Sequence, residues 1–142
     1  MKILIMFLLF YSSRSFACRP KSEFVAPSLS ENFKKSELIF KGKIISKVDM
    51  GKSTQPFGNK YTISFQIEQN LKGTPEKIVN LFSYSNTCDT FGQFAELGSE
   101  CIIFANQGII LSGVLAGEAS ACGDVKILNE KIKEISSTKS IN

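Results

Sequence analysis

The sequence predicts a mainly β domain, a five-stranded antiparallel barrel with a short N-terminal helix and a C-terminal amphipathic helix. Three observations support this fold class. Five short segments rich in β-branched and aromatic residues follow one another without the strand–helix alternation of a parallel sheet. The first of them contains a glycine, as the strands of small barrels do where they turn a corner. Near the C-terminus, apolar residues recur at helical spacing.

The two helices are predicted from a capping signal and from periodicity. Ser28 and Glu31 have the spacing of a capping box, which predicts a helix over 29–35. Four apolar residues in the segment 125–135 fall on one helical face: Val125, Leu128, Ile132 and Ile135. We expect this second helix to pack on the barrel.

The five predicted strands share β-branched and aromatic composition and are bounded by turn residues: 37–49, 61–68, 77–84, 101–105 and 109–115. Gly42 lies inside the first and is expected to mark a bulge or bend. The second has the clearest alternation of apolar and polar residues, which predicts one buried face. Composition predicts loops at 51–59, 71–77 and 85–94. The strand count best fits an OB-fold-like barrel, because a β-sandwich needs about seven strands.

The N-terminus has the features of a secretory signal peptide over residues 1–17. Lys2 precedes an apolar run over 3–10, and small residues stand at 15 and 17, so cleavage is expected after Ala17. The run is shorter than the roughly 20 residues of a transmembrane helix. The prediction is a secreted or periplasmic domain over 18–136 with a polar tail at 137–142. The alternatives are a buried N-terminal element and a lipid anchor on Cys18, although Phe16 and Ser15 fit a lipobox poorly.

Charge and composition disfavour several classes of function. Loss of Lys2 and Arg14 with the signal leaves 15 basic residues against 13 acidic ones, a net charge of +2, which argues against nucleic acid as a partner. The chain has no histidine, so it lacks the usual general base and the usual metal ligand. No phosphate-binding or dinucleotide motif occurs. We therefore expect no cofactor and no enzymatic activity, and we assign most of the twelve phenylalanines to packing.

Four cysteines survive the predicted cleavage: Cys18, Cys88, Cys101 and Cys122. An even number in a small exported domain predicts two disulfides, for which three connectivities are open. Free buried thiols are the alternative. A zinc site is disfavoured because no pair has C-x-x-C spacing.

Several motifs resemble those of a known family. An N-terminal Cys18 is followed by NFKKSELIFKGKIIS, by YTISFQIEQNLKG, and by a loop cysteine before FGQFAELGSECIIFA. In this order and spacing they resemble the netrin-like domain of tissue inhibitors of metalloproteinases, and more closely the small bacterial exported proteins grouped with them. The resemblance covers about residues 18–135.

The resemblance implies an OB-fold barrel in which a disulfide joins Cys18 to Cys88. Family members usually have a second cysteine two residues after the first, where this chain has Pro20. The cysteine expected to pair with it looks like Cys122, so the resemblance implies a Cys101–Cys122 pair instead.

For function, the resemblance implies a metalloprotease inhibitor. In animal members the free amine and the carbonyl oxygen of the first cysteine chelate the catalytic zinc of the protease. Carried over by position, Cys18 is the zinc ligand and Arg19 points into the specificity pocket, where small or polar residues are familiar. The neighbouring rim is then formed by the residues that precede Cys88: Ser85, Asn86 and Thr87. The alternative is a non-inhibitory envelope or extracellular binding module with an unknown protein partner.

Overall fold

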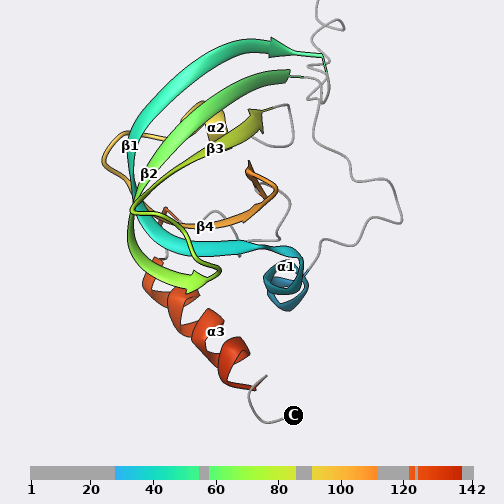
Figure 1. Ribbon diagram of the computed structural model, residues 1–142, viewed down its shortest axis with the longest axis vertical. Helices are drawn as coiled ribbons and strands as arrows, with labels where there is room; N and C mark the ends of the chain where they lie inside the picture. The colour runs from blue at the N-terminus through green and yellow to red at the C-terminus, as the bar shows by residue number, and fades with distance from the viewer. Residues whose placement is uncertain (1–27, 55–57, 86–90, 112–121, 124, 139–142) are drawn as a thin grey trace, which may run out of the picture.

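The computed structural model describes residues 28–54, 58–85, 91–111, 122–123 and 125–138. The strands are β1 (Leu38–Ser53), β2 (Gly58–Lys72), β3 (Ile78–Ser85), β4 (Glu100–Asn106) and β5 (Ile109–Ile110). The helices are α1 (Leu29–Lys35), α2 (Phe91–Phe94) and α3 (Val125–Thr138). The fold is mainly β, as predicted, with α1 and α3 at one end of a strongly curved sheet (Figure 1).

The five strands form one mixed sheet that closes on itself. The hydrogen-bonded order is β1-β2-β3-β5-β4, and β4 pairs back with β1. All of these pairs are antiparallel except β3 with β5, which is parallel and places Phe82 opposite Ile109. The prediction of an entirely antiparallel sheet was therefore wrong. The reason is parity, because strand directions that alternate around a closed sheet require an even number of strands.

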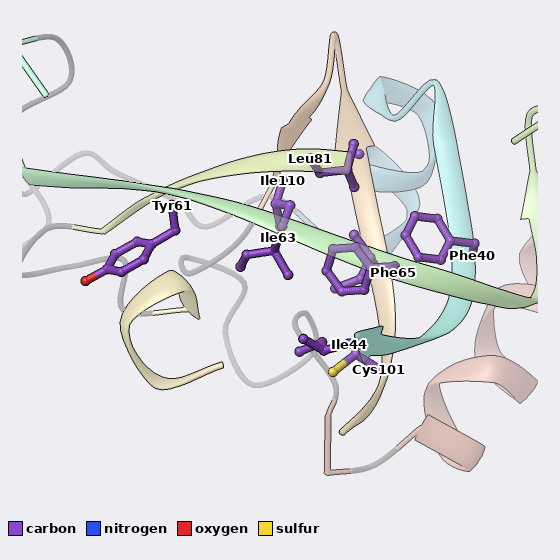
Figure 2. Close-up of a cluster of buried hydrophobic side chains, with 10 residues drawn as sticks. Phe40, Ile44, Tyr61, Ile63, Phe65, Leu81, Cys101 and Ile110 are labelled. Atoms are coloured by element: carbon purple, nitrogen blue, oxygen red, sulfur yellow. The ribbon is translucent and has the colours of Figure 1, made fainter. Parts of the chain in front are cut away.

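Side chains from every strand fill the interior of the closed sheet (Figure 2). The rings of Phe40 and Phe65 meet edge to face with their centroids 5.4 Å apart. On β2 the predicted alternation is confirmed, since Tyr61, Ile63 and Phe65 are buried while the residues between them are partly exposed.

A second cluster lies on the outer side of the sheet beneath two helices. Outward side chains of β1 and β4 pack against α1 and α3, and the buried members are Leu29, Phe33, Ile39, Ile102, Phe104, Leu128 and Ile132. Both helix predictions are confirmed, including the capping box, in which the Glu31 amide donates to Ser28 Oγ at 3.2 Å. Helix α3 continues to Thr138, two residues into the predicted polar tail.

The predicted bulge at Gly42 is also confirmed. The pairing of β1 with β2 changes register between Lys41 and Gly42. A Cβ atom at Gly42 would lie 2.8 Å from the carbonyl oxygen of Gln66, which is too close for any other residue without a shift of the backbone. The glycine thus permits the close approach of two strands where β1 bends.

Several element boundaries differ from the predictions. The β1–β2 hairpin replaces most of the predicted loop 51–59, because ladder hydrogen bonds such as those around the Lys52–Asn59 pair need no apolar side chains. Helix α2 lies within the predicted loop 85–94. The fifth strand ends at Ile110, and residues 112–115 of its predicted range are outside the described residues.

Candidate functional site

Of the predicted partner contacts, Ser85 alone lies within the described residues. It is the last residue of β3 and pairs with Asn59 of the β1–β2 hairpin. The other predicted contacts are outside the described residues: Cys18, Arg19, Asn86, Thr87 and Cys88. The zinc-binding role of Cys18 and its pairing with Cys88 therefore remain predictions, as does the signal peptide over residues 1–17.

Lys47 connects β1 by hydrogen bonds to the end of helix α2, which lies in the predicted loop 85–94. It faces the interior, opposite Ile63, and its Nζ donates to the carbonyl oxygens of Gln93 at 2.8 Å and Ala95 at 3.1 Å. These carbonyls lie at the end of α2, where a cation compensates oxygens without a partner in the helix. The same ammonium lies 5.2 Å from the centroid of the Tyr61 ring. Lys47 thus fixes the C-terminal side of the loop that begins at Ser85. Sequence reasoning missed this residue, although a lysine at an inward strand position was a signal.

Exposed apolar side chains form a row across the outer side of four strands. The cross-strand pairs Val48–Thr62, Thr62–Phe82 and Phe82–Ile109 place these four residues side by side. They point outward, because their neighbours Ile63, Leu81 and Ile110 are buried in the interior. The exposed fractions are 50% for Val48 and 37% for both Phe82 and Ile109. We call Val48, Thr62, Phe82 and Ile109 the open row. Sequence reasoning had placed the aromatic residues in the core.

A lysine lies over the aromatic member of the open row. Lys60 Nζ is 3.9 Å from the ring centroid of Phe82 and 5.7 Å from that of Tyr84, the residue opposite it on β3. At these distances the ammonium is attracted to the negative faces of the rings. The outer face near the end of β3 is therefore apolar and aromatic with a positive charge above it.

A disulfide joins Cys101 and Cys122, as the resemblance implied. Cys101 is fully buried in β4, whereas Cys122 is exposed three residues before α3 begins. The bridge therefore ties the approach to α3 to the strand on which that helix packs.

A group of three charged side chains lies near the start of β1. Lys41 Nζ is 3.2 Å from Glu100 Oε1 and 3.7 Å from Glu68 Oε2. The hydrogen bond with Glu100 raises the pKa of Lys41, and the same hydrogen bond lowers the pKa of Glu100. All three groups are in contact with solvent, so we interpret them as a surface ion-pair network.

The described residues contain neither a candidate metal site nor a candidate membrane-spanning helix. They contain no cluster of three or more cysteine, aspartate or glutamate side chains that could hold a metal ion. None of their helices combines the length and the apolar character needed to cross a membrane. Comparisons of the chain with protein-family models and with curated proteins each return no match.

Proposed function

We propose that this chain is an exported, netrin-like module that inhibits a zinc metalloprotease through the free N-terminus of Cys18. The proposal rests on the order and spacing of the motifs around the four cysteines. The observation that best supports it is the Cys101–Cys122 disulfide within a closed five-stranded sheet, because the resemblance implied both features.

The proposal includes an OB-fold barrel as the finer description of the sheet. An OB fold has five strands in a small barrel, which fits the closed order β1-β2-β3-β5-β4. The long first strand β1, which bends at Gly42, also fits this description. Helix α1 precedes the strands in the sequence and α3 follows them, which is the order expected from the sequence.

In the proposed mechanism the amine and the carbonyl oxygen of Cys18 bind the zinc of the protease. An α-amino group has a pKa near 8, so part of it is neutral at physiological pH, and zinc favours the neutral form further. A catalytic zinc keeps one coordination position open, which the amine would take from water. Arg19 would enter the specificity pocket, and the rim from Ser85 to Thr87 would contact the protease beside it. Lys47 supports this role because its hydrogen bonds hold the C-terminal side of the loop that begins at Ser85.

The test compares the secreted, oxidised chain beginning at Cys18 with a version that carries one extra alanine before it. Intact mass first establishes that residues 1–17 are removed and that the amine is free. Against a panel of zinc proteases, the native N-terminus should inhibit at least one enzyme, and the extended version should lose about tenfold or more in potency. A chain with one alanine added at the C-terminus is the control. Equal potency of the two N-termini, or inhibition by neither, would contradict the mechanism.

A non-inhibitory binding module in the envelope or outside the cell is the second candidate function. The open row favours it, because an exposed apolar surface of this kind can bind a protein without a zinc ligand. In the inhibition assay this candidate predicts no inhibition from either N-terminus.

A further inference from the structure

We propose that the open row and Lys60 bind an extended protein segment in which apolar residues flank a carboxylate. This surface lies on the outer side of β1, β2, β3 and β5, and none of its residues belongs to the predicted zinc-binding contacts. The inference goes beyond the proposed inhibitor, because it does not depend on Cys18.

The apolar character of the surface comes from residues that are adjacent across the strands. Single exposed apolar residues are common, but Val48, Phe82 and Ile109 belong to one continuous cross-strand row with Thr62. With strands about 4.8 Å apart, the row is roughly 15 Å wide, which matches about five residues of an extended chain. The described helices α1 and α3 pack on β1 and β4 and leave this row exposed.

The charge of the partner follows from Lys60. Its ammonium lies 3.9 Å from the centre of the Phe82 ring, so a molecule that covers Phe82 also removes water from Lys60. Lys41 is paired with Glu68 and Glu100, whereas no carboxylate of the described residues forms an ion pair with Lys60. Burial of an unpaired ammonium is costly, so a partner that binds here must supply an anion. A carboxylate between apolar side chains meets both requirements.

A second copy of the chain fits this surface less well. In a two-fold symmetric contact through the open row, Lys60 of each copy would face the same positive patch. A single strand of nucleic acid also fits less well, because Val48 and Ile109 are aliphatic and offer no ring on which a base could stack.

The test uses fluorescent peptides about eight residues long in which leucine and phenylalanine alternate with serine. One peptide carries two aspartates at the central polar positions, and matched peptides carry two lysines or keep the serines. We expect the aspartate peptide to bind the full secreted chain about tenfold more tightly than the lysine peptide. Lys60→Glu should remove this preference, and Phe82→Thr should weaken binding about tenfold.

Two matched controls keep the test specific. Ile78 is an exposed residue of the same strand and side, at 52%, but it lies outside the row, so Ile78→Thr should leave binding unchanged. Lys126→Glu makes the same charge reversal on α3 and should also have no effect. Phe82→Thr places a β-branched residue with high strand propensity at this position, so the variant should fold, and its circular dichroism spectrum checks this.

Four results would overturn the proposal. They are equal binding of the three peptides, equal weakening by Ile78→Thr and Phe82→Thr, displacement of the peptide by an oligothymidylate, and a dimer that Phe82→Thr dissociates. Peptide binding should be the same with and without the extra alanine before Cys18. Failure of protease inhibition therefore leaves this inference intact, and failure of peptide binding leaves the inhibitor proposal intact.

Discussion

Two walls of the same closed sheet have opposite surroundings. The covered wall, made of Ile39, Ile102 and Phe104 beneath α1 and α3, is buried on its outer side as well as its inner side. The strands that carry the open row are buried only on their inner side. Outward residues of the covered wall are at most 1% exposed, whereas those of the open row reach 50% at Val48. The covered wall thus stabilises the fold, and the open row leaves apolar area available for a partner.

Strand β1 takes part in both walls. Near its start, Ile39 and Phe40 point to opposite sides, and both are fully buried. Between these residues and Val48 the pairing with β2 shifts at Gly42 and again between Ile44 and Ser46. Bulges of this kind bend a strand and increase its twist. The start of β1 can therefore pack beneath the helices, while Val48, farther along the same strand, belongs to the open row.

A large expected effect tests how α3 packs on the covered wall. Ile132 is 1% exposed, so Ile132→Ala should lower the free energy of unfolding by about 2–5 kcal/mol, because it leaves a cavity beneath the helix. Ile127→Ala, on the same helix at 56% exposure, should change it by less than about 0.5 kcal/mol. Urea denaturation measures both. Equal losses from the two variants would mean that α3 does not pack through the Ile132 face.

The next effect concerns the disulfide that holds the approach to α3. Replacement of Cys101 and Cys122 by alanine opens a loop of 21 residues, which should cost about 3 kcal/mol in the chain-entropy model. Urea denaturation of the double variant and of the wild type, both non-reduced, measures this cost. The alternative pairing is tested by peptide mapping without reduction, and a peptide that contains Cys18 joined to Cys122 would contradict the assignment.

A smaller effect tests the bend between the two walls. Gly42→Ala places a Cβ 2.8 Å from the Gln66 carbonyl oxygen, so the strands must separate, and stability should fall by about 1–3 kcal/mol. Gly123→Ala is the matched control, since a Cβ there meets nothing within 4 Å. Thermal or urea unfolding compares them. No difference between the two variants would show that β1 does not need a glycine at its bend.

The smallest effect is the pH dependence of the Lys41–Glu100 pair. Because the folded state lowers the pKa of Glu100, its contribution to stability is present above the ordinary carboxyl range and is lost as the pH falls through the lowered pKa. The difference in unfolding free energy between wild type and Glu100→Gln should be small and constant near neutral pH and should shrink below about pH 4. Salt should reduce it as well. A difference that persists in acid and in salt would mean that Glu100 acts through packing.

The fold could be predicted from the sequence where the signals are local. The Ser28–Glu31 capping box, the alternation on β2 and the Leu128–Ile132 face of α3 each depend on residues close together in the chain, and each was confirmed. The strand pairing of residues 52–53 with residues 58–59 was missed because this ladder joins backbone groups, which leave no pattern in polar side chains.

The open row and the lysine contacts could not be predicted, because they join distant parts of the chain. Val48 and Ile109 become the two ends of one row through the register of three strand pairs, including the parallel pair of β3 with β5. The Lys47 ammonium reaches carbonyl oxygens 46 and 48 residues away. The Cys101–Cys122 pair is also long-range, and it was predicted only through the family resemblance.

The contrast between the walls is tested most directly by one pair of unfolding measurements, on Phe104→Ala and Phe82→Ala. The first removes a ring that is 1% exposed under the helices, and the second removes one that is 37% exposed on the open row. We predict a loss of about 3–5 kcal/mol for Phe104→Ala and less than half of that loss for Phe82→Ala. Equal losses would contradict the account, because Phe82 would then belong to the core that holds the fold together.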